Sequence, residues 1–338
     1  MSNREPLAAI FGLAGAILSD DERAFFRDAD PAGFILFARN CETPDQLRRL
    51  VATLHETLGH ESPVLIDQEG GRVARLKPPH WPAYPAAGTI AALGGAPARE
   101  AARLGARLIA DDLAALGVSV DCLPVLDLPA SGADPVIGDR AYGTAPSEVA
   151  ALGAAVCDGL LAGGVLPVIK HIPGHGRATV DSHHALPRVD APRAQLETHD
   201  FAPFRALAAM PWAMTAHILY TAIDSERPAT LSARLIAEVI RGSIGFDGVL
   251  LSDDLSMAAL PGGIGERAAG ALAAGCDLVL HCNGAMSEMR RVAASAPPLT
   301  PAARRRLDAG EALRRARRAP FDRRAAELRF AALMAGEG

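Results

Sequence analysis

The densest group of chemically useful side chains lies between residues 170 and 184. It reads Lys-His-Ile-Pro-Gly-His-Gly-Arg-Ala-Thr-Val-Asp-Ser-His-His and holds four of the ten histidines of the chain. Its glycines and proline indicate a shaped loop rather than a helix. Imidazole is the side chain most easily poised near neutral pH as an acid or a base. Asp181, two residues before His183, could accept an imidazole N–H and hold the ring in one tautomer, as in other catalytic dyads.

These histidines admit two other interpretations. Imidazoles bind zinc, but the spacing of His171, His175, His183 and His184 is not that of a helical H-E-x-x-H site, so we expect no metal. The histidines could instead be structural and satisfy backbone groups in a long loop. For His175, which stands between two glycines, a structural role is at least as well supported as a catalytic one.

A second candidate is the carboxylate of Asp253, which closely follows the apolar run at residues 248–251. Cleavage of a glycosidic bond needs an anion near the anomeric carbon to stabilise oxocarbenium-like charge, either covalently or electrostatically. A carboxylate on the end of a strand can do this with little reorganisation. We expect its neighbour Asp254 to point elsewhere and cap the next turn. Taken alone, Asp253 could also be the N-cap of a helix.

A scaffold that brings these residues together is predicted by the alternation of short apolar runs with longer amphipathic stretches. The runs suit strands buried on both faces of a parallel sheet. Expected strands cover residues 7–12, 33–37, 63–66, 119–123, 165–169, 212–216, 248–251 and 276–280. Expected helices cover residues 43–59, 97–117, 146–162, 193–209, 231–241, 264–275 and 301–335.

Eight strands that alternate with helices predict the α/β class and a single (β/α)8 TIM-type barrel across residues 1–338. Residues 301–335 would form a helical segment at its C-terminal end. The alternative, an open doubly wound sheet, has no support from nucleotide binding, because no G-x-G-x-x-G or Walker loop follows the first strand.

Polar residues end five of the expected strands. They are residues 67–72, 170–171, 217, 252–254 and 281–283. In barrels of this class the active site lies at the C-terminal ends of the strands, so these residues should meet on one rim.

Composition narrows the partners and the compartment. The net charge of −5 is modest and argues against nucleic acid or an anionic membrane as an obligatory partner. Ten arginines between residues 301 and 330 fit a solvated helix face better than a nucleic-acid contact. The five cysteines form no CxxC pair, which favours free thiols in a reducing compartment. The apolar run at residues 7–18 is too short to span a bilayer and lacks a signal-peptide cleavage site. We therefore expect a cytoplasmic protein, and a monomer without a cofactor.

Several of these motifs together resemble a known family, the glycoside hydrolase family 3 β-N-acetylhexosaminidases of the NagZ type. The matching segments are Lys-His-x-Pro-Gly-His-Gly with Asp-Ser-His (170–183), Ser-Asp-Asp-Leu-Ser-Met (252–257), and residues 35–40, 66–75, 124–128, 136–140 and 214–217. They cover roughly residues 8–285 in the order of the family. Ile172 departs from the aromatic residue common at its position, which bears on fine specificity.

The resemblance implies a role for each matched residue. Asp253 matches the catalytic nucleophile, His183 the general acid/base on a mobile loop, and Asp181 the partner of His183. The matched sugar-binding positions are Asp67, Arg75, Arg140, Lys170 and His171. The implied reaction removes non-reducing β-linked N-acetylglucosamine with retention, from 1,6-anhydromuropeptides of peptidoglycan recycling. The implied loop also means that His183 could lie far from Asp253 without substrate.

Four alternatives stay open from the sequence. Phosphate could replace water in the second step, or the barrel could bind sugar without cleaving it. A zinc-dependent hydrolase is a third possibility. The fourth, substrate-assisted cleavage by the acetamide, would need a carboxylate acid and a partner for the acetamide that the sequence does not offer.

Overall fold

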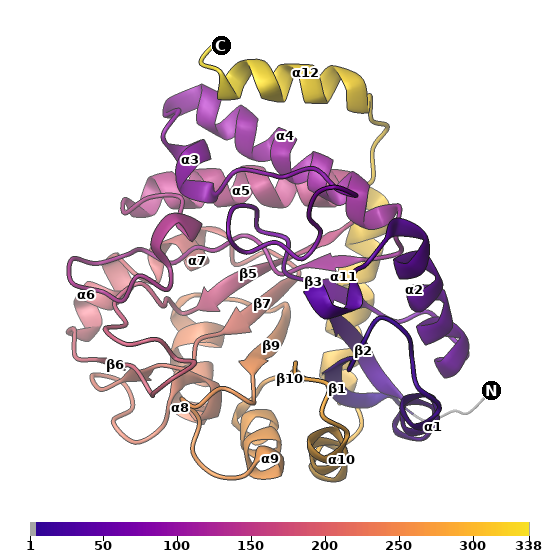
Figure 1. The fold of residues 1–338 in the computed structure, drawn as a ribbon. Coiled ribbons are helices and arrows are strands. Elements are labelled where there is room, and N and C mark those ends of the chain that lie inside the picture. Colours follow the sequence, from indigo (N-terminus) through magenta and orange to yellow (C-terminus); the bar gives the residue numbers. More distant parts are fainter. Residues whose placement is uncertain (1–4, 338) are drawn as a thin grey trace.

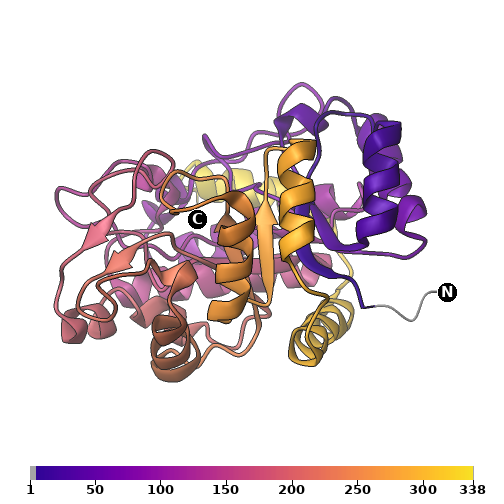
Figure 2. The ribbon, with the colours of Figure 1, turned by 90° about the horizontal axis from the view of Figure 1, so that it is seen from below.

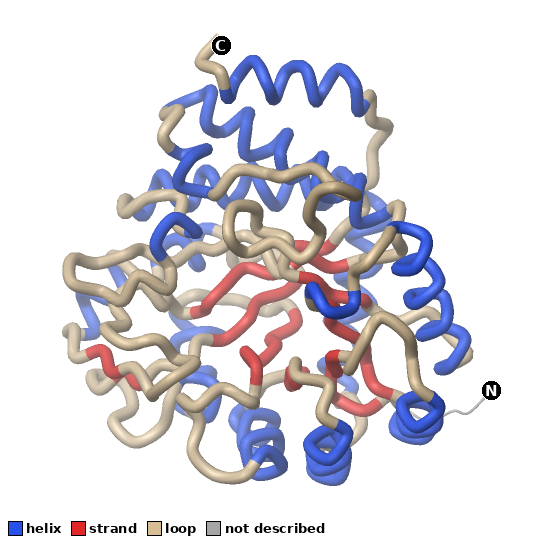
Figure 3. The backbone as a smooth tube through the Cα atoms, in the orientation of Figure 1, coloured by secondary structure: helices blue, strands red, loops and turns tan. Residues whose placement is uncertain are grey.

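The computed structural model describes residues 5–337, and its strands close into a parallel barrel (Figures 1 and 3). The order around the barrel is β1, β2, β3, β4, β5, β7, β9 and β10, and β10 pairs with β1. Their bounds are Leu7–Gly12, Pro31–Leu36, Val64–Ile66, Val120–Asp121, Leu166–Ile172, Trp212–Thr215, Val249–Asp254 and Leu278–His281. The predicted (β/α)8 barrel is confirmed. A small parallel pair, β6 (Arg188–Val189) and β8 (Leu219–Tyr220), lies outside it.

Helices surround these strands, as the blue and red segments of Figure 3 show. The α-helices from α1 to α7 are Asp20–Ala29, Pro44–Leu58, Ala87–Ala91, Gly95–Ala114, Pro146–Gly163, Arg193–Thr198 and Ala202–Ala206. Those from α8 to α12 are Ala233–Leu235, Ile264–Ala274, Met286–Ser295, Pro301–Arg317 and Arg323–Met334. A π-helical turn, η4 (Ile236–Ser243), continues α8, and short 3-10 turns are η1 (Ala38–Asn40), η2 (Gly138–Arg140) and η3 (Ala229–Leu231). Helices α9 and α10 lie side by side near β10 (Figure 2).

Three helices were not predicted from the sequence, and two predicted stretches are each divided in the structure. Helix α1 begins at a capping box in which the Ser19 hydroxyl accepts the Glu22 N–H and the Glu22 carboxylate accepts the Ser19 N–H. Helices α3 and α10 were not predicted either. The stretch at 193–209 is divided into α6 and α7, and the stretch at 301–335 into α11 and α12. Pro203 and Pro320 lie at these divisions, and proline cannot continue the hydrogen bonding of a helix interior.

The hydrophobic core has two layers because successive strand residues point to opposite faces. In β1 and β9, Ile10 and Leu251 pack inside the barrel, whereas Phe11 and Leu250 pack against the surrounding helices. The inner layer fills the barrel with side chains. A ligand can therefore enter only at an end of the strands.

The two C-terminal helices, α11 and α12, pack against different parts of the molecule. Leu299, just before α11, and Ala303 in its first turn belong to the same apolar cluster as Trp212 at the start of β7. Helix α11 therefore lies at the N-terminal ends of the strands. Helix α12 lies along α4 (Figure 1). Seven of the ten arginines between 301 and 330 pair with carboxylates, namely Arg304, Arg306, Arg314, Arg315, Arg317, Arg323 and Arg329.

Two further observations bear on the expectations from composition. All five cysteines are free thiols in the structure. Within residues 5–337, none of the helices combines the length and the apolar character that crossing a bilayer requires.

We predict that Gly12→Ala strongly destabilises the barrel. Gly12 ends β1 beside the segment that follows β10, and an added Cβ would lie 2.2 Å from the carbonyl oxygen of Cys282. Backbone on both sides must shift, so we expect the free energy of unfolding to fall by about 2–3 kcal/mol. Urea unfolding followed by circular dichroism measures it.

Gly15→Ala is the matched control, because nothing lies within 4 Å of the Cβ that it would add. We expect its effect to stay within about 0.5 kcal/mol. Equal effects of the two substitutions would contradict this account of the close approach at Gly12.

Candidate active site

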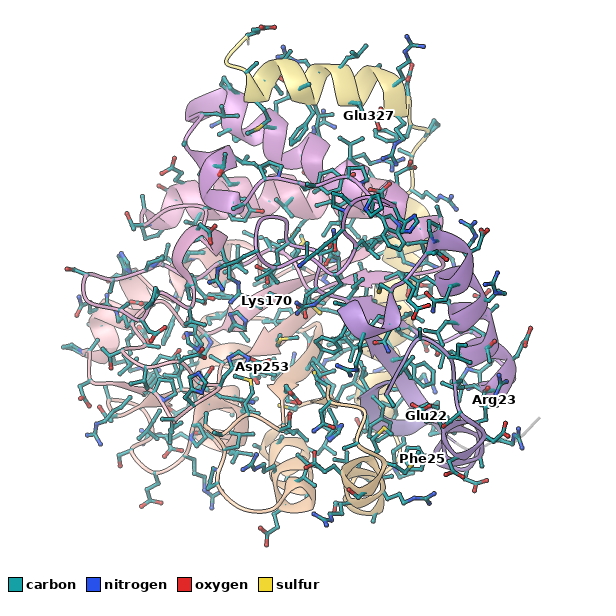
Figure 4. All side chains as sticks on the ribbon, in the orientation of Figure 1. Glu22, Arg23, Phe25, Lys170, Asp253 and Glu327 are labelled. Carbon is teal, nitrogen blue, oxygen red and sulfur yellow. The ribbon has the colours of Figure 1, made fainter. Side chains whose placement is uncertain are left out.

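A cavity of about 270 Å³ lies at the C-terminal ends of the strands. All eight residues predicted for the site line it, namely Asp67, Arg75, Arg140, Lys170, His171, Asp181, His183 and Asp253. Figure 4 shows Lys170 and Asp253 in the centre of the barrel. A larger cavity of about 640 Å³ lies at the N-terminal ends, beside α11, and is lined largely by alanine and glycine. Of these two cavities, the smaller one has a lining that combines carboxylates, histidines and cationic side chains.

Strand alternation explains why three of these side chains enter the cavity. Val168 of β5 and Leu251 of β9 point into the barrel. Lys170 and Asp253 follow them by two residues and therefore point the same way, above the apolar layer. Asp67 stands in the same relation to Leu65 of β3. Asp254 has the opposite parity, and its carboxylate accepts the N–H groups of Ser256 and Cys282, both at 3.1 Å. The prediction that Asp254 caps the next turn is confirmed.

Lys170 is the centre of a buried ionic cluster. Its ammonium, only 2% exposed, lies 2.9 Å from Asp67 Oδ1 and 2.7 Å from Glu69 Oε1. Arg75 donates to Asp67 at 2.9 Å, and Arg140 donates to both oxygens of Glu69 at 2.8 Å. Glu69 lies within one of the matched sequence motifs (66–75) but was not predicted as a site residue. Its position two residues after Asp67, on the same rim, was the only available indication.

The cluster remains charged at neutral pH. Burial alone would raise the pKa of Asp67, but Lys170 and Arg75 outweigh it and hold that pKa below the usual range. Lys170 and Arg140 lower the pKa of Glu69 against the same effect of burial. The two carboxylates in turn raise the pKa of Lys170 despite its burial. The result is a set of fixed cationic donors facing a small cavity, which suits hydroxyl and carbonyl oxygens of a sugar.

Asp127, another residue that the sequence analysis did not assign, organises the segment after β5. Its buried carboxylate accepts the N–H of His171 at 3.2 Å and that of His175 at 2.6 Å. It also lies 2.7 Å from Nδ1 of His171. Burial would raise the pKa of Asp127, but His171 and His175 together outweigh burial and lower it. With Nδ1 held by Asp127, Nε2 of His171 is the atom left for a ligand.

Asp253 is an ionised carboxylate at the end of β9. Burial would raise its pKa, but His217 and His171, together with the Asp254 N–H and Lys170, outweigh burial and lower it. Its Oδ1 accepts the N–H of Asp254 at 2.8 Å, and its own N–H donates to Thr215 Oγ1 at 3.4 Å. The side chain is therefore held on a rigid strand in the form that can attack an electrophilic carbon.

Asp181 and His183 form the predicted pair, on the loop that connects β5 to β6. His183 Nδ1 and Asp181 Oδ1 are 2.7 Å apart, and the His183 N–H donates to the same oxygen at 2.9 Å. Burial would raise the pKa of Asp181, but the hydrogen bonds from His183 lower it below the usual range. The side chain of His183 is 63% exposed, whereas Lys170 is nearly inaccessible. Nε2 of His183 is thus free to meet a ligand.

A metal site requires several ligating side chains that converge on one point. Among residues 5–337, no group of three or more histidine, cysteine, aspartate or glutamate side chains is arranged to hold a metal ion. Three of the four histidines of the 170–184 segment instead contact Asp127, Ser182 and Asp181.

Comparison with known proteins gives the family. Residues 11–309 match the glycosyl hydrolase family 3 N-terminal domain. A β-hexosaminidase of Alkalilimnicola ehrlichii is 42% identical over 281 residues, which are 81% of this chain and 80% of that protein. NagZ of Neisseria gonorrhoeae, solved with N-trifluoroacetyl-D-glucosamine, is 32% identical, with a TM-score of 0.88 over 99% of this chain and 100% of that one. A family 3 β-N-acetylglucosaminidase of Paenibacillus sp. is 34% identical, with a TM-score of 0.82 over 93% of this chain and 62% of that one.

We predict that Lys170→Met lowers stability most at neutral pH. The lowered pKa values of Asp67 and Glu69 mean that their pairs stabilise the fold above about pH 4 and lose this effect as the pH falls through the folded values. The raised pKa of Lys170 keeps its contribution intact below about pH 10. Removing the ammonium leaves two buried carboxylates without their shared cation, which should cost about 3 kcal/mol at pH 7. The cost should be smaller at pH 4, because burial raises the pKa of the carboxyl groups once Lys170 is gone and they can then take up protons. Urea unfolding at both pH values measures the difference.

Lys77→Met is the matched control, because Lys77 is the only other lysine of the chain and is exposed. We expect it to change the free energy of unfolding by less than about 0.5 kcal/mol at either pH. A deficit for Lys170→Met that is the same at pH 4 and pH 7 would contradict the ionic account.

Proposed function

Because this chain belongs to glycoside hydrolase family 3 and is a β-N-acetylhexosaminidase, we propose that it removes non-reducing terminal N-acetylglucosamine with retention of anomeric configuration. The proposed natural substrates are 1,6-anhydromuropeptides of peptidoglycan recycling, cleaved in the cytoplasm by a monomer. The observation that carries the proposal is the placement of Asp253, Lys170 and the Asp181–His183 pair around one cavity.

In the first chemical step, a carboxylate oxygen of Asp253 attacks the anomeric carbon. The glycosidic C–O bond breaks, and the leaving oxygen takes the proton from Nε2 of His183. The lowered pKa of Asp253 supports this role, since the nucleophile must be ionised. Asp181 holds Nδ1 of His183 and stabilises the imidazolium before it gives up its proton.

In the second step, the neutral Nε2 of His183 takes a proton from water, and the water oxygen attacks the anomeric carbon. The ester to Asp253 breaks and the carboxylate is restored. The exposed imidazole of His183 serves first as acid and then as base. Its position on a loop allows this, because the loop can move when the aglycone leaves and water takes its place.

The ionic cluster supplies the sugar-binding side of the proposal. The hydroxyl and acetamide groups of the terminal sugar would be held by five side chains, namely Asp67, Arg75, Lys170, Arg140 and His171. Because their mutual contacts fix them before a ligand arrives, little reorganisation is needed on binding.

We predict that Asp253→Ala abolishes cleavage of an aryl β-N-acetylglucosaminide. The loss of the attacking oxygen should lower kcat by roughly 10³- to 10⁵-fold. Initial rates with the aryl N-acetylglucosaminide and the matching aryl glucoside, for wild type and variant, test the substrate and the nucleophile together. We expect the wild type to cleave the first substrate far faster than the second.

Asp45→Ala on α2 is the control, since Asp45 is an exposed carboxylate on a surface helix. It should cleave at the wild-type rate. If Asp253→Ala remained active, Asp253 would not be the nucleophile. If the wild type bound N-acetylglucosamine but cleaved neither glycoside, the chain would be the sugar-binding barrel without activity.

The identity of the attacking molecule needs its own measurement. With phosphate present, hydrolysis gives the free sugar, whereas phosphorolysis gives the sugar 1-phosphate. We expect the free sugar alone, with product anomers observed by NMR before mutarotation showing retention. Release of N-acetylglucosamine from a purified 1,6-anhydromuropeptide would support the proposed natural substrate.

A further inference from the structure

Ser182 separates the two members of the proposed acid/base pair. Unlike His183, it is buried, with 3% of its surface exposed. The N–H groups of His184 and Ala185 both donate to the Asp181 carbonyl, at 2.9 and 3.1 Å, so residues 181–185 form a single turn. Because the turn is internally bonded, whatever holds Ser182 also sets the place of Asp181 and His183.

Two contacts hold Ser182. The N–H of Ala259, in the segment after β9, donates to its carbonyl at 3.2 Å. On the other side, Nε2 of His175 lies 3.2 Å from the Ser182 hydroxyl. This is the only hydrogen bond of the Ser182 hydroxyl among residues 5–337.

His175 is itself fixed to the barrel. Its N–H donates to buried Asp127 at 2.6 Å, and its ring lies edge-on to that of His171, with 5.6 Å between the ring centres. The next residue, Gly176, packs so closely that an added Cβ would lie 2.0 Å from the carbonyl oxygen of Leu128. The His175 ring is therefore held in a fixed position, and Asp127 links it to His171, which is proposed to bind the sugar.

The charge state of His175 also suits a hydrogen bond to a hydroxyl. Burial, and to a smaller degree the nearby His171, lower the pKa of His175 to about 4. The ring is neutral at pH 7, and a neutral imidazole offers one N–H donor and one nitrogen acceptor. Nδ1 of His175 is buried without a hydrogen-bond partner among residues 5–337, so the Ser182 hydroxyl is the hydrogen-bond partner of the ring.

We propose that His175 is a positioning residue, whose hydrogen bond to Ser182 anchors the turn that carries Asp181 and His183 and so directs His183 Nε2 toward the leaving oxygen. His175 does not exchange a proton with the substrate. The proposal rests on the acid/base role proposed for His183. It adds that the buried His175 fixes the position of the exposed His183 through Ser182.

The expected signature is a dependence on the leaving group. A poor leaving group needs protonation, whereas 2,4-dinitrophenolate leaves without it. We expect Ser182→Ala and His175→Ala to lower kcat/KM roughly 10- to 100-fold for a p-methoxyphenyl N-acetylglucosaminide, and less than about threefold for the dinitrophenyl one. The ratio of the two kcat/KM values for one preparation does not depend on the fraction of folded enzyme, so it stays interpretable if a variant is less stable.

Three further variants complete the test. His175→Gln, whose side-chain amide can still donate to a hydroxyl, should restore part of the ratio. The double variant His175→Ala with Ser182→Ala should show the ratio of a single variant rather than the product of both, because the two groups act through one contact. Ser62→Ala is the control, since it removes a buried hydroxyl that has no partner in the described structure, and its ratio should match the wild type.

His183→Ala distinguishes a failure of this proposal from a failure of the proposed function. If His183→Ala shows the strong leaving-group dependence but the His175 and Ser182 variants do not, the anchoring role is wrong. Equal losses on both substrates in those variants would also overturn it and indicate a purely structural role. If His183→Ala itself shows no dependence on the leaving group, the acid assignment fails and the anchoring proposal fails with it.

Discussion

The buried ammonium of Lys170 is the interaction on which the rest of the site depends. An ammonium removed from water is costly unless anions and hydrogen bonds replace the lost solvation. Lys170 meets this requirement with Asp67 and Glu69, which extend from the end of β3. Each of these carboxylates then holds an arginine, Arg75 or Arg140. One lysine therefore fixes the relative positions of β3, β5 and the loop that carries η2.

The site divides its chemistry between a rigid part and an exposed part. Asp253 and Lys170 stand on strands whose inward residues fill the barrel, so their positions are set by the core. His183 stands on a connecting loop and is mostly exposed. The division has a physical basis. In the proposed mechanism, the attacking carboxylate gains from a fixed place beside the anomeric carbon. The proposed acid/base must instead accommodate two molecules in turn, the leaving group and then water.

The sequence was sufficient for the features that depend on local pattern. Apolar runs located all eight barrel strands, although β2 begins at Pro31 rather than residue 33. The polar strand ends predicted the rim, and strand parity accounts for the inward direction of Asp253. Glu69 and Asp127 were not assigned, because a carboxylate is recognisable as a bridge only when its partners are placed. These partners lie 71–101 residues from Glu69 and 44–48 residues from Asp127 along the chain. Helix α1 was missed although its capping residues were visible, since the same residues were considered only as the flank of a signal peptide.

Exposure, rather than residue type, separates the histidines of the site by role. His171, His175 and His217 are all buried, and burial lowers the pKa of His175 and of His217. A buried imidazole that takes up a proton must hold a charge away from water, which opposes its use as a proton carrier. It can still donate or accept a hydrogen bond as a neutral ring, which is the role that its neighbours require. His183 has water around most of its ring and Asp181 at Nδ1, so it is the exposed imidazole of the segment whose Nε2 can reach a ligand. The sequence placed four histidines in one segment, but only the fold distinguishes the ring suited to carry a proton from the rings suited to hold it in place.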